Sequence, residues 1–179
     1  YSLWIRIVQT QVRRYLLAIS ALMVLWILLR SIKFSIGNTD AERRLWYFYY
    51  FPMLFIPMLS VFVSQSLGKD EAFRLPRWTK LLYIPTLLLL LLVLTNDLHR
   101  QVFSFPSGVL SDGEYRYEKG YYFVLGWEAL CAAFSLVLMV RSCRIPHSRR
   151  IRWLPLVPFA LSLAYAYAYV KKVGCSRAI

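Results

Sequence analysis

The sequence predicts an all-α integral membrane protein, a helical bundle with about five transmembrane helices. Hydrophobic residues make up 59% of the 179-residue chain and charged residues only 17%, whereas a soluble domain carries about 25% charged residues. Nearly all of the Lys and Arg residues lie in or beside the short polar segments that separate five long apolar stretches. These stretches are apolar on all sides, and five such helices are too many for one small protein core. Lipid is therefore the environment that fits them.

The whole chain, 1–179, is predicted to be a single transmembrane helical domain. Its five apolar stretches give the expected spans, which cover about 15–36, 45–67, 78–98, 121–141 and 152–171. Each is close to the roughly 17–25 residues that a helix needs to cross a bilayer. The six tryptophans mostly lie near the ends of the spans, where rings with one polar edge are favoured.

Three of the spans contain prolines, at Pro52 and Pro57 in the second, Pro85 in the third, and Pro155 and Pro158 in the fifth. In a membrane bundle, neighbouring helices satisfy the carbonyl groups that a proline leaves without a partner, so kinks are tolerated. We expect these prolines to shape the helix packing.

The distribution of Lys and Arg sets the predicted orientation. If the chain starts in the cytoplasm, the cytoplasmic connections carry a small excess of Lys and Arg, which agrees with the positive-inside rule. The first residue is Tyr1, and nothing resembles a signal peptide. We therefore expect an excerpt of a longer protein, in which one further span at each end makes seven helices.

Composition and motifs exclude several classes of function. The net charge of +13 is assigned to loops beside the membrane, which attract anionic lipid headgroups, and not to nucleic-acid binding. The three cysteines form no C-x-x-C motif, and no histidine cluster is present, so neither a metal site nor a cofactor is predicted. The sequence also lacks G-x-S-x-G, H-E-x-x-H and P-loop motifs, so no catalytic residue is predicted.

The candidate ligand-sensing residues begin where the third span ends. Asn96 and His99 stand three apart with Asp97 between them, so on a continuing helix Asn96 and His99 share a face and could meet one ligand or each other. A histidine in this position suits a pH or ligand sensor. The competing interpretation is that Asn96 and Asp97 only end the helix and that His99 is a solvated residue at the membrane surface.

The outer loop, about 99–120, is the longest and most polar connection. Phe103, near its start, is a further ligand-sensing candidate. The loop's Ser-Asp-Gly sequence predicts a turn, with Val109–Leu110 and Tyr115–Tyr117 as the strands of a short hairpin. This loop would be either a ligand-contacting lid or a plain solvated loop. The last candidate is Glu128, because an ionisable group within a span is expensive to bury; it could instead reach the membrane surface or pair with an arginine.

Several motifs together are similar to a known family. They are Arg-Ser-Ile-Lys-Phe at 30–34, an aromatic and proline-rich run at 43–57, and the Asn-x-x-His element of 96–99 followed by Phe103. These motifs, with those at 120–122 and 143–148, resemble the seven-helix N-terminal membrane region of bacterial sensor histidine kinases, over about 13–170.

The resemblance implies a membrane sensor of a two-component signal-transduction system, in the bacterial cytoplasmic (inner) membrane. It would pass an unknown signal through a last helix to a cytoplasmic histidine kinase module. The chain itself has no phosphotransfer helix or ATP-binding motif, so it is predicted not to be an enzyme. The expected partners are the lipid bilayer, an unknown small ligand and, through the signalling module, a second copy. The alternative is a small transporter or channel-like protein, which the gathering of polar residues at one end disfavours.

Overall fold

The computed structural model describes residues 10–35, 39–66, 69, 73–105 and 115–142. The predicted fifth span, with Pro155 and Pro158, lies outside the described residues, as do Val109–Leu110 and 143–148. In chain order, the described elements are α2 (Thr10–Ser35), α3 (Thr39–Phe48), α4 (Tyr50–Ser66), η1 (Arg77–Leu82), α5 (Tyr83–Leu94), α6 (Asn96–His99), β1 (Phe103–Ser104), β2 (Arg116–Tyr117) and α7 (Lys119–Ser142).

The predicted all-α membrane bundle is confirmed. Within the described residues, four helical stretches are long and apolar enough to cross a membrane: Thr10–Lys33, Asp40–Ser66, Arg77–Leu94 and Lys119–Arg141. The second stretch starts earlier than the expected span of about 45–67, because α3 extends it beyond the purely apolar residues. The first stretch also starts earlier than expected, at Thr10.

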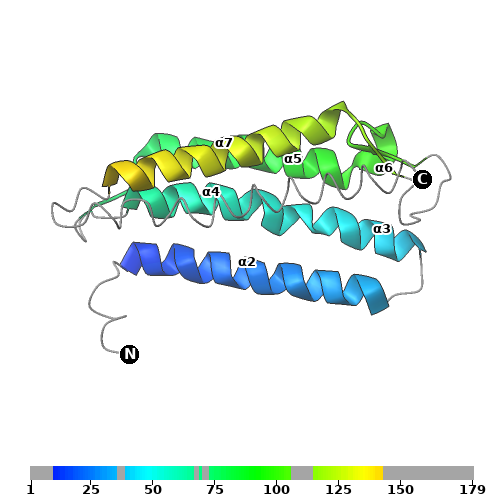
Figure 1. Cartoon of the computed structure of the whole chain (residues 1–179), viewed down its shortest axis with the longest axis horizontal. Helices are drawn as coiled ribbons and strands as arrows, with labels where there is room; N and C mark the ends of the chain where they lie inside the picture. The colour runs from blue at the N-terminus through cyan, green and yellow to red at the C-terminus, as the bar shows by residue number, and fades with distance from the viewer. Residues whose placement is uncertain (1–9, 36–38, 67–68, 70–72, 106–114, 143–179) are drawn as a thin grey trace, which may run out of the picture.

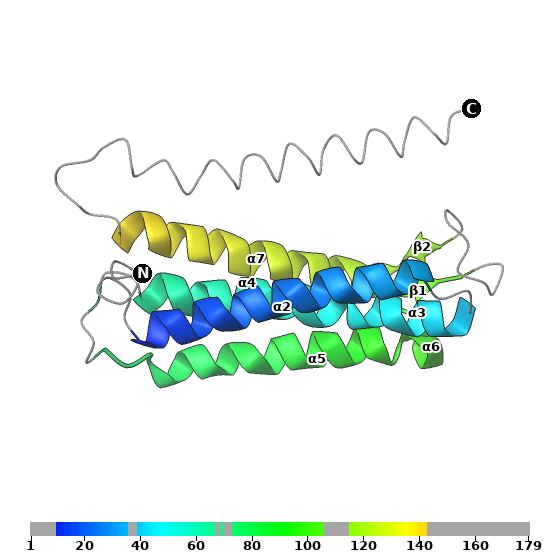
Figure 2. The ribbon, with the colours of Figure 1, turned by 90° about the horizontal axis from the view of Figure 1, so that it is seen from below.

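The long helices lie side by side and alternate in direction along the chain (Figure 1). A second view shows α2 crossing α4, with α5 and α7 on opposite sides of them (Figure 2). The α4 helix is the centre of the bundle, since it packs against α2, α5 and α7. One end of the bundle holds α3, α6, β1, β2 and the start of α7; we call it the loop end.

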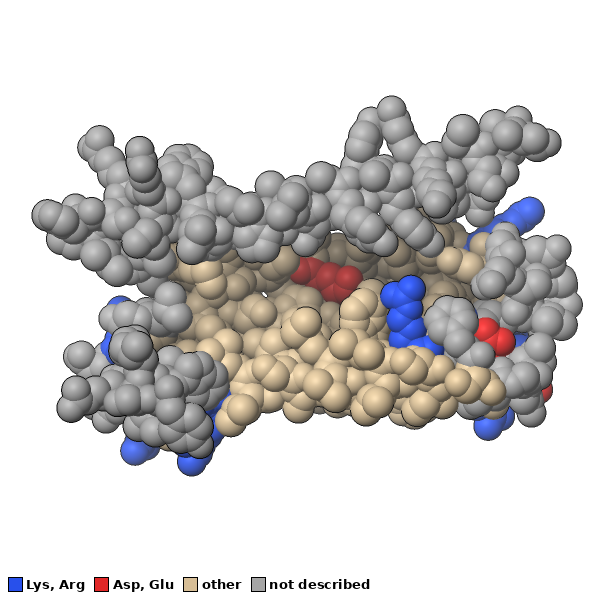
Figure 3. All heavy atoms as spheres, turned by 60° about the horizontal axis from the view of Figure 1, so that its bottom comes forward, with Lys and Arg blue, Asp and Glu red and all other residues tan. Residues whose placement is uncertain are grey.

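The surface of the bundle is apolar along its middle. Large apolar side chains such as Ile27 of α2, Leu88 of α5 and Phe123 of α7 are more than half exposed, which is expected of helices that face lipid. Lys and Arg side chains gather toward the two ends on the face drawn in Figure 3. This distribution matches an apolar band of the kind that a bilayer covers.

A proline explains why the second span is two helices. Pro52 has no N–H to donate to the carbonyl of Phe48, and its ring crowds that carbonyl. The helix accordingly ends at Phe48, passes through a turn at Tyr49 and resumes as α4 at Tyr50. Pro57 lies inside α4, so it leaves the carbonyl of Met53 without an intrahelical partner.

The third span begins with a 3₁₀ helix and continues as an α-helix. Residues Arg77–Leu82 form a 3₁₀ helix, which leads into the α-helix at Tyr83. Pro85 falls in the first turn of α5, directly after the 3₁₀ segment, and the fixed φ of proline is compatible with the start of an α-helix.

Small polar residues join the helices in the apolar middle. The Ser64 hydroxyl of α4 and the Ser135 hydroxyl of α7 are 2.6 Å apart, and Ser135 also donates to the carbonyl of Ser60 at 3.1 Å. On the α5 side, the indole N–H of Trp127 donates to the Thr86 hydroxyl at 3.1 Å. Such short polar side chains let membrane helices approach closely and hydrogen-bond across the interface.

Candidate functional site

The side chain of Asn96 organises the loop end. Asn96 is fully buried, and its Oδ1 accepts hydrogen bonds from the backbone N–H groups of Val102 and Phe103, both at 3.0 Å. Its Nδ2 donates to the Phe103 carbonyl at 2.9 Å and to the Tyr47 hydroxyl at 3.1 Å. One amide therefore joins α6, β1 and α3, and both ends of the amide are satisfied.

Asp97 extends this network to the surface. The Tyr47 hydroxyl donates to Asp97 Oδ1 at 2.7 Å, and the same oxygen lies 3.4 Å from Arg43 Nε. Arg43 also forms an ion pair with Asp40 one turn earlier in α3, at 3.0 Å. The Asp97 side chain is 42% exposed and that of Arg43 is 21% exposed, so this ion pair lies at the boundary between the buried network and solvent.

A small pocket opens beside the ion pair. Its volume is about 100 Å³, and it is lined by Arg43, Asn96, Asp97, Arg100 and Phe105. The lining combines two guanidinium groups, a carboxylate, an amide and one aromatic ring. A pocket of this size and chemistry suits a small polar ligand or a few ordered water molecules.

His99 lies on a different side of α6 and has different partners. Its Nε2 is 3.0 Å from the carbonyl of Leu92 and 3.3 Å from the Thr95 hydroxyl, while its Nδ1 accepts from the backbone N–H of Gln101 at 3.0 Å. These partners fit a neutral ring with its proton on Nε2. Asn96 and His99 share no hydrogen bond among the described residues, and each side chain has its own set of partners.

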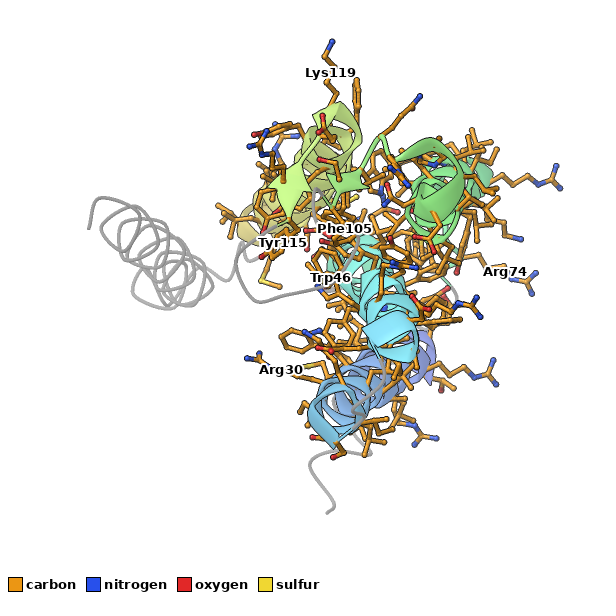
Figure 4. All side chains as sticks on the ribbon, turned by 90° about the vertical axis from the view of Figure 1, so that its right-hand side faces the viewer. Arg30, Trp46, Arg74, Phe105, Tyr115 and Lys119 are labelled. Atoms are coloured by element: carbon orange, nitrogen blue, oxygen red, sulfur yellow. The ribbon has the colours of Figure 1, made fainter. Side chains whose placement is uncertain are left out.

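Phe103 is the centre of an aromatic cluster at the loop end. It is fully buried, and its ring centroid lies 4.4 Å from Trp46, 5.5 Å from Tyr50 and 5.8 Å from Tyr121. Trp46 also contacts Phe105 and Tyr115, and all three labelled rings lie close together in Figure 4. The cluster anchors the loop end to α3, α4 and α7.

A hairpin forms at the loop end, with a first strand that differs from the predicted one. Phe103 pairs with Tyr117, and Ser104 pairs with Arg116, while Val109–Leu110, the predicted partner of the Tyr115–Tyr117 strand, lies outside the described residues. The Ser104 hydroxyl also donates to Glu118 at 2.8 Å. The first strand begins earlier because Asn96 binds the backbone of Val102 and Phe103 and holds it extended.

Glu128 makes no hydrogen bond or ion pair with the other four candidates among the described residues. It is on α7, about two turns from the start of the helix. Its Oε1 is buried and has no hydrogen-bond partner within the described part of the chain. Figure 3 shows acidic atoms recessed in the apolar middle of the molecule.

The structure adds residues to the site that the sequence did not reveal. Arg43 and Tyr47 of α3 lie in the aromatic and proline-rich run at 43–57, and both contact Asp97. Asp40, Arg43 and Tyr47 are spaced three and four apart, which places them on one helical face. That spacing is the signal that could have identified them. Within the described residues, no group of three or more His, Cys, Asp or Glu could hold a metal ion.

The comparisons with known proteins agree with this architecture. No curated protein and no solved structure matches the chain. The family model described as the N-terminal 7TM region of histidine kinase matches residues 1–175, which is nearly the whole chain. The resemblance found in the motifs is thereby confirmed. This chain belongs to the family of N-terminal seven-transmembrane sensor regions of histidine kinases.

Proposed function

We propose that this membrane region detects a signal at the loop end and passes it through its helices to a cytoplasmic histidine kinase module. The main support is the network around Asn96 and Asp97. It joins α3, α6 and β1 through short hydrogen bonds, and these elements are continuous in the chain with the spanning helices α4, α5 and α7. A change in this network would therefore act on three spans at once.

The part of the network that meets solvent is the Arg43–Asp97 ion pair, next to the pocket of about 100 Å³. A ligand that binds either charge, or a change in the ionic environment, competes with the ion pair. If Asp97 loses Arg43, the Tyr47 hydroxyl and Asn96 lose a fixed partner in turn. A ligand of this kind acts by favouring one of two helix arrangements. It must therefore bind one arrangement more tightly than the other.

The transporter alternative has one supporting feature among the described residues, the buried carboxylate of Glu128 within α7. Within the apolar middle of the bundle, the polar contacts are short serine and threonine hydrogen bonds that hold helices together. A transporter is expected to have charged or broken segments near the midplane, whereas the described ion pairs lie at the loop end.

The proposal is tested with the natural gene in cells, joined to a reporter of its output. The reporter is read over a range of external pH and osmolarity, with Arg43→Gln and Asp97→Asn as test variants. Arg44→Gln is the matched control, since Arg44 is the neighbouring and exposed arginine of α3. We expect both test variants to change the output or its response, and the control to behave as the wild type. Wild-type responses in both test variants, at equal amounts in the membrane, would contradict the proposal.

A further inference from the structure

A second and larger groove lies at the loop end, on the side where α5 ends and α7 begins. Its volume is about 540 Å³, and it is lined by Leu92, Arg100, Gln101, Glu118, Lys119, Gly120 and Phe123. Only Arg100 is shared with the small pocket beside Asp97. None of the sensing candidates lines this groove, so its chemistry needs a separate explanation.

The groove is basic at its rim and apolar along its wall. Arg100 and Lys119 are both exposed, and Figure 4 shows Lys119 pointing away from the bundle. The carboxylate of Glu118 accepts a hydrogen bond from Ser104. With one carboxylate and two cations, the lining carries a formal net charge of +1.

The wall of the groove continues into the lipid-facing surface. Phe123 on α7 is 71% exposed, and on α5 Leu91 is 57% and Leu88 is 61% exposed. Leu92 lies in the last turn of α5, and Phe123 is in the second turn of α7. The groove therefore sits at the level where headgroups meet hydrocarbon.

The backbone holds the groove in a fixed shape. His99 contacts the Leu92 carbonyl with one ring nitrogen and the Gln101 N–H with the other, which clamps two lining residues together. Gly120 N–H donates to the Gln101 carbonyl at 2.8 Å. Arg100 adopts φ of 50°, the left-handed conformation that ends the short α6 and turns the chain toward Gln101. These contacts build the groove before any ligand arrives.

We infer that this groove binds the headgroup of an anionic phospholipid such as phosphatidylglycerol. The phosphodiester would lie between Arg100 and Lys119, where its single negative charge matches the net charge of the lining. An acyl chain would run along Leu92 and Phe123 onto the exposed leucines of α5. Basic pockets between membrane helices are suited to such headgroups. A soluble anion would gain nothing from the apolar wall, and for this reason we assign the groove to lipid.

The test uses the full chain purified in a neutral detergent. Retained lipid is counted by native mass spectrometry after titration with phosphatidylglycerol, with phosphatidylcholine and inorganic phosphate as separate arms. The test variant is Arg100→Gln with Lys119→Gln. The control is Arg116→Gln with Arg74→Gln, which removes two exposed arginines that do not line the groove.

We expect phosphatidylglycerol to bind the wild type and the control alike, and the test variant about 30-fold more weakly. That factor corresponds to two basic residues at about 1 kcal/mol each. Equal loss in test and control variants would mean a diffuse charge effect and would overturn the proposal. If phosphatidylcholine binds as tightly as phosphatidylglycerol, the net charge of the headgroup does not select the lipid, and the proposal is overturned. Competition by inorganic phosphate at the same concentration would assign the groove to a soluble anion. None of these outcomes bears on the proposed sensing role of Arg43 and Asp97.

Discussion

At the scale of single residues, the loop end depends on one buried amide. Asn96 makes four hydrogen bonds, three of them to the backbone of Val102 and Phe103. Since it is fully buried, no water can replace the amide at these partners without rearrangement. A buried backbone group that loses its partner costs about 1–3 kcal/mol, so the contribution of this side chain is large relative to its size.

We therefore expect Asn96→Ala to lower the free energy of unfolding by about 2–3 kcal/mol. Asn96→Asp should lower it at least as much, because it places an acceptor oxygen against the Phe103 carbonyl, which Asn96 Nδ2 now contacts at 2.9 Å, and buries a carboxylate. Thermal unfolding in detergent measures both. Leu98→Ala is the control, since Leu98 is 86% exposed and its loss should change little. A melting curve for Asn96→Ala that coincides with that of the control would contradict this account.

Sequence reasoning at this scale identified the polar positions but not their partners. The Asn-x-x-His element and Phe103 stand out in an apolar chain. Their roles as sensing residues stay a prediction. What the pattern could not give was the direction of each side chain, because α6 ends at His99 and the chain turns at Arg100. That turn brings Val102 and Phe103 back onto Asn96, and it separates His99 from it.

At the scale of elements, hydropathy was sufficient to find the described spans, and proline position decided their internal breaks. Pro52 ends α3 at Phe48, whereas Pro85 is accommodated in the first turn of α5. In the sequence, Pro52 and Pro85 both lie within apolar runs. They differ only in their distance from the start of a helix, which the sequence does not mark. The position of β1 could not be read from hydropathy either, since the Asn96 amide fixes its backbone and its own strand propensity does not.

The junction between the hairpin and α7 requires a glycine. A Cβ built on Gly120 would lie 2.8 Å from the Gln101 carbonyl oxygen and 3.1 Å from a Val102 methyl group. The first contact is with backbone, which cannot move without breaking the Gly120 N–H to Gln101 hydrogen bond. Gly126, two turns further along the same helix, has nothing within 4 Å of such a Cβ among the described residues.

These two glycines make a matched pair. Gly120→Ala should lower the free energy of unfolding by about 1–3 kcal/mol, the usual cost of overpacking. Gly126→Ala should leave it unchanged or raise it by up to about 1 kcal/mol, because alanine favours helix. Denaturant or thermal unfolding of the purified chain compares them directly. If both variants unfold alike, the close approach at Gly120 does not limit stability.

At the scale of the whole molecule, the alternating helices place the loop end and the opposite end on different sides of the membrane. Within the described part of the chain, Lys69 and Arg74 lie in the connection between α4 and η1, at the opposite end from α6 and the hairpin. The small excess of Lys and Arg favours a cytoplasmic position for that connection. We therefore predict that the loop end faces the outside, which is the side from which an external signal would arrive.

This orientation can be read from single cysteines in intact cells. The three native cysteines are first replaced by serine, and one cysteine is then introduced as Arg116→Cys at the loop end or Arg74→Cys at the opposite end. Both positions are exposed, so both should react in permeabilised cells. A membrane-impermeant maleimide should label only Arg116→Cys in intact cells. Labelling of Arg74→Cys alone would reverse the orientation, and the sensing network around Asp97 would then face the cytoplasm.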